Sequence, residues 1–237
     1  MIPNHPIFTK VLMAEDPGYP PAGWYEIHGD TGKSAIIWSL CSWRYEMNKR
    51  KTLIIELGEP YAYSQVSHWA DIPFESVILL RSHTNILEDA FNLIQASGEE
   101  IGQVIVENLG FLLGSGRQLP SVENFLGLPS NLFKLAKLAK ERDIAFFATS
   151  YEVWRPDLPG QRKAPLGGSM LTTLCRDQRL LLTRTAFLQR GGIHVGERIK
   201  ISNLAAPNTR HCEVNIQYHE GPVRSRQKDI INARLQS

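Results

Sequence analysis

Cysteine and long apolar runs are scarce in this chain of 237 residues. Its three cysteines, Cys41, Cys175 and Cys212, are widely spaced, and neither a CxxC pair nor a Cys/His spacing typical of zinc sites occurs. These absences exclude a disulfide framework and a zinc finger. No apolar run approaches the roughly 18 residues of a membrane-spanning helix, and the first residues lack the basic and apolar regions of a signal peptide. We therefore expect a cytoplasmic protein with no membrane partner.

An excess of one charge is also absent, because the net charge is only +2. This excludes strongly basic proteins of the histone type and strongly acidic ones. The charges are nevertheless unevenly distributed: residues 1–150 carry 12 Lys and Arg against 17 Asp and Glu, whereas residues 151–237 carry 14 against 7. An acidic front and a basic rear indicate a site for a polyanion in the rear, although ordinary fluctuation in surface charge explains the same numbers.

Apolar residues make up 43% of the chain, which is enough for a sizeable core, and their pattern predicts an α/β fold. Short apolar strands are expected at 24–27, 52–56, 77–80, 104–106 and 144–148, and helices at 33–48, 65–69, 85–96 and 131–142. Strands that are apolar throughout and alternate with helices indicate a mostly parallel sheet flanked by helices on both faces. In the rear, short strands at 170–174, 180–183, 199–201 and 214–218 have no helix between them, so we expect C-terminal antiparallel strands.

The sharpest local pattern lies between the first predicted strand and the first predicted helix, and reads IHGDTGKS from Ile27 to Ser34. Glycines let backbone N–H groups turn toward a phosphate, a lysine reaches the β- and γ-phosphates, and a Ser or Thr hydroxyl binds Mg²⁺. The end of the pattern fits a phosphate-binding loop, but its first glycine position holds Ile27. A simple glycine turn is the alternative. The residues predicted to hold ATP are His28, Gly29, Asp30, Thr31, Gly32, Lys33 and Ser34, with the Ser34 hydroxyl on Mg²⁺.

Carboxylates end two of the neighbouring predicted strands, as nucleotide hydrolysis requires. Glu107 follows the strand at 104–106 and suits Mg²⁺ binding through water. Glu56 and Glu59 follow the strand at 52–56 and suit the orientation of an attacking water. The alternative for each is a solvated carboxylate at a strand end.

The order of these motifs resembles the ATPase core of the RecA/RadA recombinases. The segment 23–29 resembles that family's entry to the phosphate loop, 102–109 its Walker B strand, 165–171 the end of its second DNA-binding loop, and 179–184 the strand that follows. The resemblance spans roughly residues 15–220 and implies one RecA-like P-loop core over 1–237, with an N-terminal arm at 1–18 and a basic C-terminal tail at 221–237.

The resemblance also implies single-stranded DNA as the partner, together with self-association or pairing with a RecA-family paralogue. Carried over by position, the first DNA loop contains Arg117, and the second runs from Arg155 to Gly168. The residues expected on DNA are Arg117, Arg155, Arg162, Lys163, Gly167 and Gly168. Gly- and Pro-containing loops with Arg and Lys can follow a phosphate backbone.

Several departures from the family pattern concern hydrolysis. The phosphate loop is about two residues shorter, Ser150 stands where the family has a sensing Gln, and the spacing from Glu56 to Glu59 is off by one residue. We therefore expect a DNA-dependent ATPase with weak, altered or lost hydrolysis in recombination or repair. One alternative is a non-catalytic RecA-fold adaptor in a repair or mutagenesis complex. Another is a replicative helicase domain, which the glycines at 167 and 168 disfavour.

Overall fold

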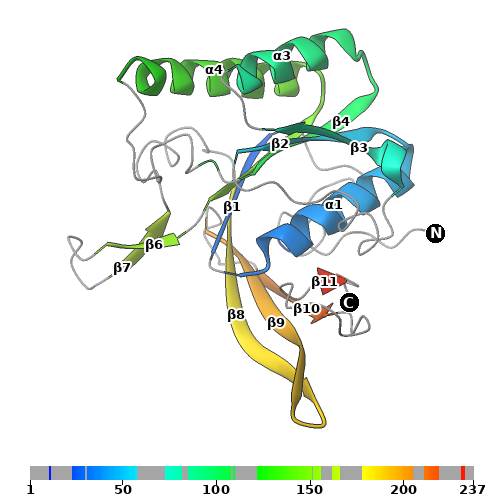
Figure 1. Ribbon diagram of the computed structural model, residues 1–237, viewed down its shortest axis with the longest axis vertical. Coiled ribbons are helices and arrows are strands. Elements are labelled where there is room, and N and C mark those ends of the chain that lie inside the picture. Colours follow the sequence, from blue (N-terminus) through cyan, green and yellow to red (C-terminus); the bar gives the residue numbers. More distant parts are fainter. Residues whose placement is uncertain are drawn as a thin grey trace.

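The computed structural model describes residues 11, 23–29, 31–57, 73–81, 85–107, 109, 122–150, 152–155, 162–165, 178–204, 211–218 and 231–232. These residues form a mixed α/β fold around one large sheet (Figure 1). The predicted helix at 65–69 and the predicted strand at 170–174 lie outside the described residues.

The large sheet contains nine strands in the part of the chain that is described. They are β1 (Trp24–Gly29), β2 (Lys51–Glu56), β3 (Val77–Arg81), β4 (Ile101–Glu107), β5 (Ala145–Ser150), β8 (Gln178–Arg190), β9 (Ile193–Asn203), β10 (His211–Tyr218) and β11 (Ile231–Asn232). Their order across the sheet is β11-β10-β9-β8-β1-β5-β4-β2-β3. The strands from β8 to β3 in this order are parallel, and β8 to β11 pair antiparallel. The predicted α/β class with a mostly parallel sheet is therefore confirmed.

Three α-helices are described: α1 (Lys33–Asn48), α3 (Ile86–Ala96) and α4 (Val122–Glu141), with a short 3-10 helix, η2 (Phe74–Ser76), before β3. The first two lie where the sequence predicts them. The third begins nine residues before its predicted start at 131, because Gly127 and Pro129, both poor helix residues, argued for a later start. No helix in the described ranges is long and apolar enough to cross a membrane.

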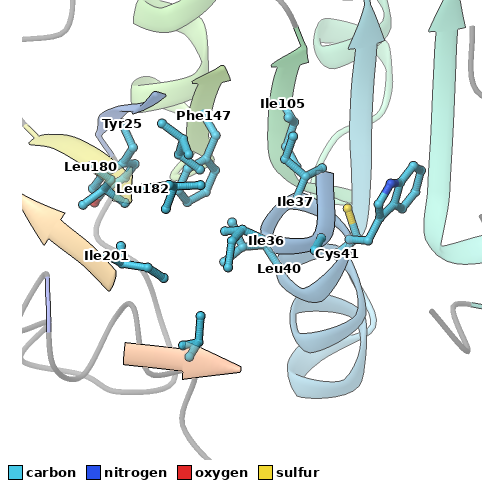
Figure 2. Packing of buried hydrophobic residues seen from close by; sticks show 14 of the residues in the cluster. Tyr25, Ile36, Ile37, Leu40, Cys41, Ile105, Phe147, Leu180, Leu182 and Ile201 are labelled. Atoms are coloured by element: carbon cyan, nitrogen blue, oxygen red, sulfur yellow. The ribbon is translucent and has the colours of Figure 1, made fainter. Parts of the chain in front are cut away.

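The two faces of the sheet are covered separately, by α1 on one face and by α3 and α4 on the other (Figure 1). Alternate residues of each strand enter the two cores, as the pleat of a strand requires. Tyr25 and Ile27 of β1 pack on the α1 side, whereas Trp24 packs on the other. Figure 2 shows the α1 core, in which Ile37 lies toward Ile105 of β4. This alternation decides which polar residues can share a site.

Two features of the rear differ from the prediction. The strands expected at 180–183 and 199–201 are parts of the much longer β8 and β9. Within the segment predicted as a DNA loop, β6 (Glu152–Arg155) and β7 (Arg162–Pro165) form a separate antiparallel pair. Val11, inside the predicted N-terminal arm, is buried in the α1 core, and its carbonyl accepts a hydrogen bond from Asn203.

Candidate functional site

Five parallel strands end at one edge of the sheet, next to the start of α1. The chain leaves β1 through α1 on one face and leaves β4 through α4 on the other, while β5 lies between β1 and β4. In α/β proteins, ligands bind outside the carboxyl ends of the strands, where the connections change face in this way. The residues that end these strands are Gly29 (β1), Ser150 (β5), Glu107 (β4), Glu56 (β2) and Arg81 (β3).

The loop from β1 to α1 depends on two glycines. Gly29 has a φ of 140°, and a Cβ there would lie 2.4 Å from the carbonyl oxygen of Leu182 on β8. Gly32 is the N-cap of α1 with a φ of 75° and a ψ of −3°, which is left-handed backbone that favours glycine. A Cβ on Gly32 would lie 2.1 Å from Cδ1 of Ile199 on β9. Both glycines of the predicted loop are therefore required by conformation and by close packing.

Lys33 begins α1, and its ammonium group folds back over the loop. The side chain is only 7% exposed, and its Nζ donates a hydrogen bond to the carbonyl oxygen of Gly29. No acidic residue stands in the first turn of α1, and no side chain caps its start. The positive end of the helix dipole and a buried ammonium group thus point to the same place, which favours an anion there.

Thr31 ties the loop to the antiparallel part of the sheet. Its hydroxyl donates a 2.5 Å hydrogen bond to Oε2 of Glu197 on β9. The other carboxylate oxygen of Glu197 lies 3.1 Å from Nε of Arg184 on β8. The loop is consequently connected through Glu197 to the β8–β9 strand pair, a connection that the sequence pattern did not indicate.

Glu56 and Glu107 are neighbours on adjacent strands. They are partners in the β2–β4 register and have exposed fractions of only 1% and 3%. Paired residues of parallel strands point to the same face, and both follow the alternation of Ile54 and Ile105, which places them on the α1 side. Two buried carboxylates side by side repel each other unless a cation or a proton intervenes. Nε of Arg81 lies 3.7 Å from Glu56 and offsets part of this repulsion.

Cys41 reports that the field of Glu107 reaches α1. Burial raises the pKa of the Cys41 thiol, and the charge of Glu107 raises this pKa further, whereas a hydrogen bond with Thr52 lowers it. The thiol therefore remains protonated near neutral pH and is a poor nucleophile. We assign Cys41 to the core, where Figure 2 shows it on α1.

His28 lies on the opposite face from the Lys33 and Glu107 side chains. It follows the alternation of Trp24, packs at 3% exposure and is the register partner of Ser150. Of the residues predicted to hold the nucleotide, His28 therefore contributes backbone to this edge while its side chain points to the α3 and α4 side.

A buried polar cluster that the sequence did not predict joins three strands on this second face. The hydroxyl of Ser150 donates a 3.0 Å hydrogen bond to Glu26 Oε1, and Nε of Arg179 donates a 2.8 Å bond to Oε2. Glu26 and Ser150 are fully buried. Glu26 and Arg179 both occur in the segments that resemble recombinases, but their spacing along the chain gives no indication that they meet.

The remaining predicted residues are described only in part. The backbone of β6 and β7 pairs Arg155 with Arg162 and Trp154 with Lys163, so three of the predicted DNA-binding residues share one end of a two-stranded ladder. The residues outside the described part are Asp30, Glu59, Arg117, Gly167 and Gly168. The backbone of Ser34 lies in the first turn of α1, directly after Lys33.

The residues at this edge suit Mg²⁺ bound together with a nucleotide. Within the described residues, no three His, Cys, Asp or Glu side chains are grouped so that they could hold a metal ion by themselves. Mg²⁺ usually takes one or two carboxylates and completes its coordination with phosphate oxygens and waters. Glu107 and Glu56, with the Ser34 hydroxyl, supply the protein's part of such a set.

Comparisons with known proteins add no relative to this picture. No model of a known protein family matches the chain, and a search of curated proteins found no significant match.

Proposed function

We propose that the chain is a RecA-like P-loop protein that binds ATP with Mg²⁺ at the carboxyl edge of its parallel strands and acts on single-stranded DNA in recombination or repair. The observation that carries this proposal is the β1–α1 junction, where a left-handed Gly32 is followed by a buried Lys33 whose ammonium folds over the loop. A phosphate placed there would meet the first N–H groups of α1 and the ammonium group together.

Two further features support the nucleotide part of the proposal. Glu56 and Glu107 present neighbouring carboxylates on the same face as α1, where Mg²⁺ bound to the phosphates would offset their repulsion. In the proposed site, Glu107 and Ser34 hold the ion, and Glu56 orients water. The short loop and the Ser150 hydroxyl, which is engaged with Glu26, support weak or absent hydrolysis.

The DNA part of the proposal is supported by charge. The rear of the chain carries an excess of seven positive charges, from 14 Lys and Arg against 7 Asp and Glu over 151–237. The β6–β7 ladder brings Arg155, Arg162 and Lys163 together on adjacent backbone positions. Clustered cations attract single-stranded DNA through its phosphates. Self-association or pairing with a RecA-family paralogue belongs to the same proposal.

One observation favours a second candidate, a RecA-fold adaptor whose nucleotide site is vestigial. The two polar side chains of the loop already have partners within the protein, because Lys33 donates to Gly29 and Thr31 donates to Glu197. An ATP-binding loop must exchange at least the first of these bonds for phosphate.

Isothermal titration calorimetry with ATP and Mg²⁺ separates the two candidates. We expect the wild-type protein to bind, and Lys33→Ala to weaken binding at least about tenfold, because a charge-assisted bond to phosphate is worth about 1.5–3 kcal/mol. Lys137→Ala is the matched control, since Lys137 lies exposed on α4 in an ion pair with Glu141. Equal affinity in the wild type and Lys33→Ala would contradict the assigned site, and a wild type that binds no nucleotide would favour the adaptor.

A further inference from the structure

The β8–β9 hairpin extends away from the helices as a two-stranded ribbon (Figure 1). Its strands of 13 and 11 residues are joined by Gly191 and Gly192, whose φ angles of 59° and 81° suit the tight hairpin turn that matches strand twist. The inner half is buried in the α1 core through Leu180, Leu182 and Ile201. The outer half, beyond Thr183, is mostly exposed, so it serves no purpose in that core.

One face of this outer half carries an ordered aromatic and polar cluster. Phe187 is 47% exposed, and the Arg184 guanidinium lies 4.6 Å from the centre of its ring. The His194 ring lies 4.8 Å from the Phe187 ring, and its Nε2 is 3.2 Å from Nε2 of Gln189. Arg184, Phe187, Gln189 and His194 therefore form one contiguous surface, which we call the ribbon face.

The ribbon is strongly basic. Between residues 178 and 203 the sequence has five Lys or Arg and a single acid, Glu197. That carboxylate is buried and is engaged by Arg184 and Thr31. Arg190 and His194 lie exposed near the turn, together with the apolar Ile193, which is 63% exposed. The surface that remains available thus combines cations with apolar and aromatic groups.

The ribbon face is also continuous with the β1–α1 loop. Glu197 accepts a hydrogen bond from Thr31 of the loop and pairs with Arg184, which in turn covers one side of Phe187. Binding on the ribbon and the conformation of the loop therefore share the Glu197 carboxylate.

We propose that the ribbon face binds single-stranded DNA, with a base stacked on the exposed surface of Phe187 and phosphates held by Arg190 and the neighbouring cations. An exposed aromatic ring beside arginines is the arrangement that sequence-independent single-strand binding uses, since every base has a stacking face. A protein partner would instead favour a larger apolar centre depleted of charge. The choice of DNA as the ligand rests on the proposed function, but the site is distinct from the segment 155–168.

Anisotropy of a fluorescein-labelled oligothymidylate tests the ribbon face. Relative to the wild type, Phe187→Ala should bind about 5- to 150-fold more weakly, the change expected from the loss of one base–aromatic stack. Phe187→Tyr should restore binding to within about threefold, because it keeps the ring. Leu204→Ala is the matched control, since Leu204 is similarly exposed, at 46%, directly after β9 but outside the ribbon face.

A double variant, Arg162→Ala with Lys163→Ala, separates this inference from the proposed function. Weakening by the double variant without weakening by Phe187→Ala would overturn the ribbon site and leave the DNA function standing. Weakening by Phe187→Ala alone would support the ribbon and remove the segment 155–168. Failure of the wild type to bind the oligonucleotide would overturn both. If Phe187→Ala changed only the oligomeric state, measured by light scattering, the ribbon would be a protein interface and the proposal would be wrong.

Crosslinking gives a second measurement that does not depend on affinity. A bromodeoxyuridine oligonucleotide irradiated in complex with the wild type should attach to the tryptic peptide 185–190, which contains Phe187 between Arg184 and Arg190. Crosslinks confined to other peptides would place the DNA elsewhere.

Discussion

Gly32 carries two constraints at once, one from its backbone and one from its neighbours. Its left-handed φ of 75° favours glycine by itself, and Ile199 and Ile216 lie within 2.1 Å and 3.2 Å of where a Cβ would stand. The residue therefore sets the start of α1 and the close approach of the loop to β9 and β10. At the scale of single residues, the candidate site depends on this glycine as much as on Lys33.

Alanine substitution separates the two constraints. Gly98 has a similar φ of 58°, but nothing lies within 4 Å of its Cβ position, so Gly98→Ala measures the backbone cost alone. We expect Gly98→Ala to lower the free energy of unfolding by about 1–2 kcal/mol. Gly32→Ala should cost about 1–3 kcal/mol more because it overpacks the core, and should weaken ATP binding. Urea unfolding of both variants measures the difference, and equal losses would show that the contacts with Ile199 and Ile216 relax without cost.

Helix α1 is the element that joins the parallel and antiparallel parts of the sheet. Figure 2 shows Ile37 toward Ile105 of the parallel part, and Ile36 and Leu40 on the side of α1 that faces Ile201 of β9. The helix that begins with Lys33 is thus anchored along its length by the strands that carry the ribbon. This packing lets the loop, α1 and the β8–β9 hairpin act as one rigid unit.

Shortening Leu40 should weaken this anchor. Leu40 is fully buried, so Leu40→Ala should lower the free energy of unfolding by about 2–5 kcal/mol through lost burial and the cavity left behind. Glu46→Ala is the control on the same helix, because Glu46 is exposed and should change stability by no more than about 0.5 kcal/mol. Equilibrium urea unfolding gives both values. A loss below about 1 kcal/mol for Leu40→Ala would mean that α1 repacks freely against the sheet.

For the whole molecule, the charge split coincides with a change in architecture. The net-negative residues 1–150 form the parallel strands up to β5 and the three helices, whereas the net-positive residues 151–237 form the β6–β7 ladder and the antiparallel strands. The near-neutral total therefore conceals an acidic unit that contains the proposed nucleotide site and a basic unit that contains both proposed DNA contacts.

The salt dependence of DNA binding should reflect this division. Binding of single-stranded DNA releases counterions, with a log–log slope of about −0.7 per phosphate contact. Arg190→Gln, on the ribbon in the basic rear, should make the slope less negative by about 0.7. Lys137→Gln, on α4 in the acidic front, should leave it unchanged. Anisotropy titrations at several salt concentrations measure the slopes, and equal effects of the two substitutions would argue against the division.

Much of the front of the chain was predictable because its patterns are local. The apolar runs at 24–27, 52–56 and 77–80 are strands, and the helix predicted at 33–48 has the same bounds as α1. The outer hairpin was missed because, beyond the core, its residues show neither a continuous apolar run nor a buried alternation. The β6–β7 pair was missed because it lies in a polar segment that contains prolines.

At the candidate site, the sequence identified the loop and the two carboxylates but not their surroundings. Lys33 and Gly32 stand in a recognisable order, whereas Thr31 and Glu197 are 166 residues apart and Glu26 and Arg179 are 153 apart. The face toward which His28 points was also not evident, because it depends on which core each alternate residue of β1 enters.

The sequence alone determined where strands and helices alternate, and that a glycine-rich turn followed by lysine opens the first helix. These are properties of neighbouring residues, decided by side-chain period and backbone sterics. Only the tertiary structure decided that Glu56 stands beside Glu107, that Glu197 links the loop to the ribbon, and that Gly102 leaves room for the buried Arg44. The reason is physical: strand order and register follow from the joint burial of both sheet faces, which no local pattern contains.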